Sequence, residues 1–575
     1  MSEVIINTPR REDMQDIAKA IRSLGGNAGN AAVLDATYTA MLDGENTSRI
    51  FRLWWPLSGE NGDNRYARLC RWFRMLSNAW SDQVYTLRGP DWRVSGGLTE
   101  LTPMADLAKK SKARVWTDME TPEAEWLDED PMCWYIRGNA LSLKDGTMDV
   151  LAVEGADSAF DVTGNLAPVY TFSNALWIAS YTDGQYEYKT FATANLGGMR
   201  PWACDVAPDG SKREMTWHAT FGGSLTEDGK LTSGVGNRPA WRVAASTGLS
   251  YARKWDAYEG VYSDTDADWL LDVWQLRHWE TENSGTLEGC TNYNYQYTVA
   301  FPEEQVTWVT LSKANGDHLL AGSEVEIGSH PEGTSNDRNT GTDYDICAAA
   351  KVVRVEAVTI DEVAYDRIHL DATDPFDVPA TAYLSTMPWS TGSTEAVPWH
   401  KDGSINSCTD GRSPARIAGV EVLDGAYALG LDPLWVSTWN EAAEDGLKGR
   451  YHVWECRDSE KQSSAVTNYT DTGIEFTHTT SGWSYIKHHL RTKTGLLIPE
   501  AVGGSASTYL KSAFAFDGSS GVRAPWRFGL LYSGGSAGLA CASGLIVPGS
   551  AGWYGRPRLS GSGKKRGEWQ GATAA

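Results

Sequence analysis

The chain reads Gly534-Gly535-Ser536-Ala537-Gly538-Leu539 and then Gly555-Arg556-Pro557-Arg558-Leu559 near its C-terminus, and these two stretches carry the most specific pattern in the sequence. Glycine adopts backbone conformations with positive φ and lets chain segments approach each other closely. Large apolar residues, among them Trp526 and Trp553, recur around the glycines, which disordered Gly/Ser linkers do not show. The pattern therefore predicts an ordered surface built from loops over residues 503–563.

The side chains between these anchors are free to differ, because they need not pack in the core. No charged residue lies between Arg527 and Arg556, and that stretch also lacks Asn, Gln and Met. Two apolar residues, Leu545 and Ile546, are predicted to be exposed there, which would be unusual on a surface without a partner. We therefore expect that replacing both with Ser leaves the thermal stability nearly unchanged.

These motifs resemble the C-type-lectin-like fold of formylglycine-generating-enzyme type, in the branch formed by the variable proteins of diversity-generating retroelements. That branch shares an invariant frame of Gly-Gly, Ala-Gly-Leu and Gly-Arg-Leu steps. Weaker similarity lies in residues 408–411 and 416–421, which resemble the family's RGIEN turn, in residues 496–499 and 503–505, and in a long helix expected over residues 266–285. The family's usual Gly-Asn after the turn is replaced by Ala426-Tyr427. The resemblance covers roughly residues 165–575, without a β-rich insertion.

The resemblance implies a set of variable binding residues and a set of scaffold residues. In the family, template-directed mutation alters adenines, typically in asparagine codons, and only some residue types can result. The residues of permitted type, expected on the binding surface, are Leu530, Tyr532, Ser533, Ser536, Ser543, Leu545, Ile546, Ser550, Gly552 and Tyr554. The residues expected to form the scaffold are Trp526, Gly534, Gly535, Gly538, Leu539, Trp553, Arg556 and Leu559.

Hydrophobic periodicity and turn residues predict the organisation of the chain. Helices are expected over residues 12–24, 65–80, 249–258 and 266–282. Strands are expected over residues 132–136, 148–153, 169–181, 186–192, 307–311, 349–360 and 366–370, and few regular elements beyond 395. Together with the resemblance, this predicts an α+β chain: an N-terminal helical attachment or oligomerisation region (1–90), a small β-rich module (91–165) and a C-type-lectin-like domain (166–575). That domain would hold a β insertion at about 290–395 and a variable binding region at about 526–559.

Composition and charge disfavour several functions. The formal net charge of −23 repels phosphate backbones, so no nucleic-acid partner is expected. The eight cysteines are scattered without a CxxC pair, which is typical of reduced thiols and not of a zinc ribbon. The sequence shows neither a signal peptide nor an apolar run long enough to cross a membrane. We therefore expect synthesis in a host cytoplasm, no membrane insertion and release by lysis as part of a virion tail.

Candidate catalytic residues are present, but each lacks a partner. The formylglycine-generating enzyme uses a pair of nearby cysteines, whereas the corresponding region here offers Cys541 alone. Residues 534–538 match the G-x-S-x-G nucleophile motif around Ser536, yet no His follows His489. The neighbours His488 and His489 have no further ligand at metal spacing. We therefore expect no enzyme activity, no catalytic residue, no metal site and no cofactor.

The predicted function is binding of a bacterial surface protein or glycan by a phage tail-fibre protein, through a hypervariable lectin-like surface. Tyr532 and Tyr554 would be rigid aromatic contacts, Leu545 and Ile546 apolar contacts, and the serines adaptable hydrogen-bonding groups. A homotrimer attached to other virion tail proteins would raise the avidity of weak single sites. Two alternatives stay open: a tail-associated glycan depolymerase, and a virion decoration protein that adheres to glycans.

Overall fold

The structure is a computed structural model of the chain, and strands dominate it. It describes residues 64–79, 83–89, 94–95, 112–116, 135–183, 186–255, 258–278, 289–290, 297–329, 344–386, 389–395, 414–552, 554–560 and 565–571. Among the described residues, strands account for 43% and helices for 13%, so the fold is β-rich. The predicted α+β class is therefore wrong.

Much of the difference between the predicted and the observed fold class lies beyond residue 395. Few regular elements are predicted there, but residues 415–560 form the strands from β22 (Ala415–Ile417) to β35 (Leu559–Ser560). Several of these strands have only two or three residues, too few alternating positions to show the two-residue period of a strand. Longer predicted strands are confirmed: β5 spans Met148–Val153 and β8 spans Tyr186–Ala192.

The described helices are few and mostly follow the predicted apolar stripes. Helix α4 (Arg65–Ala79) confirms the helix predicted over residues 65–80 and buries Leu69, Trp72 and Phe73, because residues three or four apart share one face. The predictions over residues 249–258 and 266–282 correspond to α7 (Ala245–Ala252) with the 3₁₀ turn η4 (Arg253–Trp255), and to α8 (Asp264–His278). The helix predicted over residues 12–24 lies outside the described residues. None of the described helices is long and apolar enough to cross a membrane.

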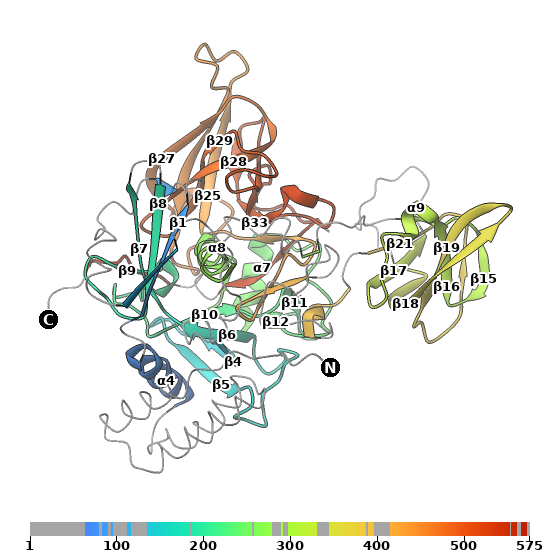
Figure 1. The fold of residues 1–575 in the computed structure, drawn as a ribbon, viewed down its shortest axis with the longest axis horizontal. Helices are drawn as coiled ribbons and strands as arrows, with labels where there is room; N and C mark the ends of the chain where they lie inside the picture. Colours follow the sequence, from blue (N-terminus) through green and yellow to red (C-terminus); the bar gives the residue numbers. More distant parts are fainter. Residues whose placement is uncertain are drawn as a thin grey trace.

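We call the described residues outside 297–385 the body of the molecule. Two sheets lie in its N-terminal part (Figure 1). One has the strand order β10-β6-β4-β5, and α4 packs against it; the other has the order β3-β1-β8-β7-β9. The first sheet joins residues on both sides of the domain boundary expected at 165. The strands not yet bounded are β1 (Gln83–Gly89), β3 (Lys112–Trp116), β4 (Tyr135–Ser142), β6 (Val169–Asn174), β7 (Trp177–Asp183), β9 (Arg200–Pro201) and β10 (Met215–Ala219). The turn η3 (Ala203–Asp205) and the hairpin of β11 (Gly223–Leu225) and β12 (Leu231–Ser233) follow in the chain.

The described residues between 297 and 385 form a small barrel that stands apart from the body at one end of the molecule (Figure 1). Its sheet has the order β14-β21-β17-β18-β19-β16, and the two edges meet where Val299 bridges Leu311. Closure removes the free edges of a sheet. The elements are β14 (Tyr297–Thr298), β15 (Glu303–Val306), β16 (Trp308–Ser312), α9 (Lys313–Gly316), β17 (Glu324–Ser329), β18 (Cys347–Ile360), β19 (Val363–Leu370), β20 (Phe376–Val378) and β21 (Ala382–Ser385). Arg238 of the body reaches the barrel, 3.4 Å from the buried carboxylate of Glu326.

The C-terminal half builds two further sheets around α8, which lies in the middle of the body (Figure 1). The larger has the order β2-β28-β30-β33-β32-β24-β34, with β29 beside β28; the smaller has the order β27-β26-β25-β31. Fully buried tryptophans such as Trp269, Trp274 and Trp435 fill the core between them. The remaining elements are β2 (Val94–Ser95), β13 (Gly260–Val261), η5 (Ser393–Glu395), β23 (Val420–Val422), β24 (Tyr427–Leu429), β25 (Pro433–Trp439), β26 (Gly449–Glu455), η6 (Val466–Asn468), β27 (Thr470–His478), β28 (Gly482–Arg491), β29 (Leu497–Val502), β30 (Ala513–Phe516), β31 (Gly521–Arg523), β32 (Trp526–Phe528), η7 (Gly534–Ser536), β33 (Gly538–Ser543) and β34 (Gly555–Pro557).

Candidate functional site

The candidate site is the loop surface, which we define as residues 529–537 and 544–552 together with Tyr554. Strand β32 lies between β24 and β33 in the sheet, and β24 also pairs with β34. The first loop therefore joins β32 to β33, and the second leads from the end of β33 to the start of β34. The paired strands β32, β33 and β34 hold both ends of each loop, which restricts where the loop side chains can lie.

A buried ion pair anchors β32 to the central helix. Arg527 donates two parallel hydrogen bonds to Asp264, from Nε at 2.8 Å and from Nη2 at 2.7 Å, and Nη2 also donates to the Leu497 carbonyl at 2.7 Å. Both side chains are almost fully buried. Burial raises the pKa of Asp264, and the adjacent Arg527 charge opposes that shift. The bidentate geometry fixes the direction of β32 as well as its position.

Two further arginines anchor β34 and the segment that follows it. Arg556 donates to the backbone carbonyl of Asp424 at 2.6 Å and lies 3.0 Å from the Asp424 carboxylate. Arg558 donates to the carbonyls of Glu421 and Ala219, at 2.5 and 2.7 Å. Both guanidinium groups are buried, so each needs these partners to offset the loss of water. The arginines of the Gly-Arg-Pro-Arg stretch are therefore structural side chains that point inward.

Helix α8 carries more buried carboxylates that continue this framework. Asp268 and Asp272 both lie within ion-pair distance of Arg491, at 2.5 and 2.7 Å, and Asp272 is also 3.0 Å from Lys189. Burial raises the pKa of Asp268 to about 6. Burial alone would also raise the pKa of Asp272, but Arg491 and Lys189 lower it below the ordinary value. Losing one member would leave another charge buried without compensation, so the network resists local rearrangement.

The ten residues expected on the binding surface are not equally accessible. Tyr532 and Leu545 are exposed, with 50% and 38% of the residue surface accessible. Half-buried members are Ser533, Ser536, Ile546, Ser550 and Tyr554. Leu530, Ser543 and Gly552 are buried, so these residues do not belong to the outer surface. Val547, which the sequence prediction omits, is 44% exposed.

Two of the half-buried residues pack on the core. Ile546 contacts the cluster that contains Trp526, and the Tyr554 ring lies 5.5 Å from the Trp526 ring. The backbone just before β32 holds this loop, because the Ala524 amide donates to the Ile546 carbonyl at 3.0 Å. Ile546 packs on the core, whereas its neighbours Leu545 and Val547 are exposed.

The exposed side chains fall into two groups. The turn with Tyr532 leads into Gly538, the first residue of β33, whereas Leu545 and Val547 follow Ser543, its last residue. A strand rises about 3.3 Å per residue, so the two ends of the six-residue strand are about 17 Å apart. A partner that contacts both groups must therefore span the length of β33.

The predicted scaffold residues lie mostly in the core. Trp526, Leu539, Arg556 and Leu559 are buried, and Trp553 lies outside the described residues. The φ angles of Gly534 and Gly538 are 53° and 155°, and Gly535 is exposed. A Cβ at Gly555 would lie 2.9 Å from the Trp526 ring, so a larger residue would push that ring aside. Glycine thus has a conformational role at positions 534 and 538 and a packing role at position 555.

The candidate catalytic residues occupy structural positions. Cys541 is fully buried in β33. Ser536 lies in the 3₁₀ turn η7, and its hydroxyl donates to the Ser533 carbonyl at 2.6 Å, instead of standing between a strand and a helix. His489 is buried in β28, where burial and the nearby Arg527 charge lower its pKa well below the ordinary value. Within the described ranges, no cluster of His, Cys, Asp or Glu side chains could hold a metal ion.

One buried constellation resembles a catalytic triad, and the sequence analysis did not find it. Thr216 Oγ1 lies 3.1 Å from His218 Nε2, and His218 Nδ1 lies 2.9 Å from Asp266. All three side chains are nearly inaccessible to solvent, and the His218 ring stacks on Trp269 at 3.9 Å. Asp266 also accepts a hydrogen bond from Ser560, which ties it to β35. The chain of hydrogen bonds joins β10 to α8 and the C-terminal strand, so we interpret it as part of the core.

Neither the protein-family models nor the curated proteins gave a match to this chain.

Proposed function

We propose that this protein is a receptor-binding protein of a phage tail, which binds a bacterial surface protein or glycan through the loop surface. The exposed side chains Tyr532, Leu545 and Val547 on a backbone held by buried ion pairs carry the proposal. The likeness of the glycine and arginine motifs to the C-type-lectin-like variable proteins belongs to the same proposal.

The rigidity of the backbone supports binding with a low entropic cost. Arg527 holds β32 at the start of the first loop, and Arg556 holds β34 at the end of the second loop. Both arginines donate hydrogen bonds to buried acceptors. A surface that is ordered before it meets its partner loses little conformational freedom on binding. This property suits a site whose side chains change while its backbone stays the same.

The chemistry of the exposed groups supports a protein or glycan partner. Tyrosine combines a large apolar ring with a hydroxyl, and exposed Leu545 and Val547 offer apolar area to a partner. The loop surface has no charged side chain, so contact would depend on shape, apolar burial and hydrogen bonds. Such single contacts are often weak, and trimeric display on a tail would strengthen them through effective concentration.

The experiment is a binding assay with fluorescently labelled full-length protein and intact cells from a panel of bacterial strains, read by flow cytometry. On a strain that the wild type binds, we expect Y532S and the double variant L545S/V547S each to weaken binding by about tenfold or more. The matched control is V363S, which changes an exposed valine on the barrel. Equal binding by wild type and both loop variants would overturn the proposal.

A further inference from the structure

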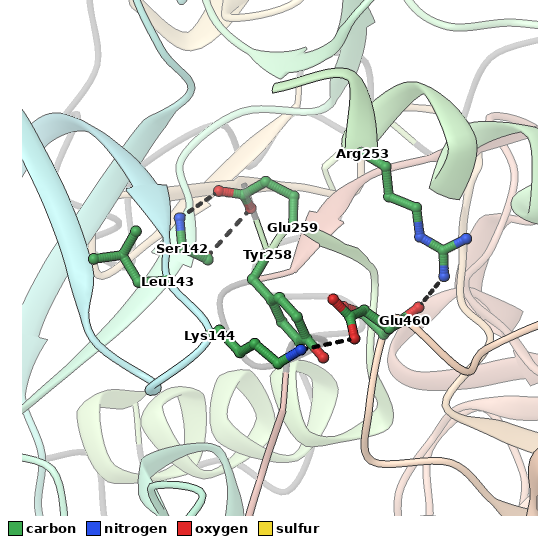
Figure 2. A pocket seen from close by; sticks show the side chains of 8 residues that line it. Ser142, Leu143, Lys144, Arg253, Tyr258, Glu259 and Glu460 are labelled. Atoms are coloured by element: carbon green, nitrogen blue, oxygen red, sulfur yellow. Dashed lines mark hydrogen bonds and ion pairs between the residues drawn. The ribbon is translucent and has the colours of Figure 1, made fainter. Parts of the chain in front are cut away.

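A second site lies outside the loop surface. A cleft of about 470 Å³ opens between the turn after β4, the segment that follows η4, and the loop after β26 (Figure 2). Its lining residues are Ser142, Leu143, Lys144, Arg253, Tyr258, Glu259, Ser459 and Glu460. None of them belongs to the loop surface, and the volume lies within the range of about 300–1,000 Å³ that is usual for small-molecule sites.

The floor of the cleft is built around a buried carboxylate. Glu259 accepts hydrogen bonds from the Ser142 amide at 2.7 Å, from the Ser142 hydroxyl at 3.3 Å and from the Tyr170 hydroxyl at 2.5 Å. The side chain is inaccessible to solvent. Glu259 therefore has its donors already and shapes the floor without offering a free charge to a ligand.

The mouth of the cleft holds an ion pair that is easy to displace. Lys144 lies 3.3 Å from Glu460, with 69% and 52% of the two side chains exposed, and its ammonium is 5.5 Å from the centre of the Tyr258 ring. Figure 2 shows these three side chains pointing toward one another. Exposed pairs of this kind contribute little to stability, so a ligand can replace one partner at little cost.

Arg253 supplies the other cation. Its Nη2 donates to the Ser459 carbonyl, and among the described residues no carboxylate lies within ion-pair distance of this guanidinium. The group is exposed, and several N–H donors remain for a ligand. A guanidinium fork binds a carboxylate with two parallel hydrogen bonds, which an ammonium cannot do. The cleft thus combines the Arg253 guanidinium, which suits a carboxylate, with the exposed ammonium of Lys144.

The remaining groups select for a hydroxylated ligand. Glu460 can accept hydrogen bonds from hydroxyls once Lys144 turns to the ligand, whereas Ser142 and Ser459 are buried and only shape the wall. Leu143 is 38% exposed and offers an apolar wall, while the Tyr258 hydroxyl is held by Asp458 at 2.7 Å, which fixes the ring. We propose that this cleft binds a carboxylated monosaccharide unit, with its carboxylate on Arg253 and Lys144 and its hydroxyls on Glu460. This assignment does not depend on the loop surface.

The test uses the full-length protein and isothermal titration calorimetry with glucuronate, with glucose as the neutral counterpart. We expect glucuronate to bind, R253Q to weaken it by about tenfold or more, and glucose to bind at least about tenfold more weakly than glucuronate. The matched control R450Q changes an exposed arginine outside the cleft and should leave binding unchanged. K144Q, on an exposed turn, gives a second variant if R253Q does not fold.

The outcomes separate the proposal from its alternatives. Equal affinity for glucuronate and glucose, or unchanged glucuronate binding in both R253Q and K144Q, would overturn it. A polyuronide oligosaccharide that binds more tightly than glucuronate identifies an anionic polysaccharide as the source of the unit, whereas preference for the monosaccharide identifies a free sugar acid. Loss of binding to bacterial cells in Y532S, with glucuronate binding intact, would show that the two sites act separately.

Discussion

Arg527 and Asp264 are 263 residues apart in the chain, yet they form a two-pronged, almost fully buried ion pair. The pair joins β32, which precedes the first loop of the candidate surface, to the start of α8 in the centre of the body. The position of the loop surface consequently depends on a contact between distant parts of the sequence.

The first prediction concerns this pair. R527Q leaves the Asp264 carboxylate buried without its partner, so we expect the free energy of unfolding to fall by about 3–5 kcal/mol. Urea denaturation followed by tryptophan fluorescence measures it. R450Q is the matched control, because Arg450 makes exposed pairs and its loss should cost less than about 1 kcal/mol. Similar losses in both variants would contradict the structural role of the buried pair.

The second prediction distinguishes neighbours in the second loop. L545S and V547S replace exposed side chains, so each should change the free energy of unfolding by less than about 0.5 kcal/mol. I546S removes a side chain that packs on the core and should cost at least about 1 kcal/mol. The double replacement of Leu545 and Ile546, expected from the sequence to be nearly neutral, should thus lower the melting temperature. Thermal denaturation of the single variants checks this order of stability. An unchanged melting temperature in I546S would show that Ile546 does not pack on the core.

A third prediction uses two glycines. A Cβ at Gly223 would lie 1.7 Å from the Pro557 carbonyl oxygen, a backbone atom that cannot move without displacing β34. G223A should therefore cost about 3 kcal/mol or more, or prevent folding. At Gly549, in the second loop, a Cβ would meet nothing within 4 Å, so G549A should be tolerated. Soluble yield and melting temperature of G223A and G549A test this difference. A stable G223A would mean that β11 and β34 do not pack as described.

The fourth prediction concerns pH. Burial raises the pKa of Asp432 to about 7 from an ordinary value of 3.8, in a cluster with Arg566 and Asp264. Because the folded state binds this proton more tightly than the unfolded state, the associated stability is full below about pH 4 and is lost as the pH rises toward 7. D432N lacks this titration, so its stability relative to wild type should rise across that window, by up to about 1.4 kcal/mol per pH unit.

Urea denaturation of wild type and D432N at several pH values between about 4 and 8 measures this difference. A difference that stays constant, or that falls as the pH rises, would show that Asp432 is ionised throughout the window and paired with Arg566.

Part of the fold could be predicted because some signals are local. The apolar stripe of α4, with Leu69, Trp72 and Phe73 at helical spacing, gave its helix, and the alternating run in Met148–Val153 gave β5. The fold class failed because strands such as β32 and β34 have three residues each and are held by neighbours far away in the chain. Their register is set by pairing, which no short window contains.

The candidate site, too, could be predicted only in part. The glycines and the uncharged stretch between Arg527 and Arg556 indicated a loop surface, but the residue types did not tell exposed Leu545 from half-buried Ile546. Two adjacent apolar residues carry no local signal of which one faces the core; the packing of Ile546 against the cluster of Trp526 is visible only in the folded chain.

The sequence by itself determined which segments can be helices, where glycine must relieve the backbone, and that the C-terminal stretch is ordered, since these depend on periodicity and on the size of a side chain. The tertiary structure decided which arginines are buried, which loop side chains face outward, and that Arg253 and Lys144 share a cleft. Burial and charge pairing depend on distances between residues far apart in the chain, and only folding sets those distances.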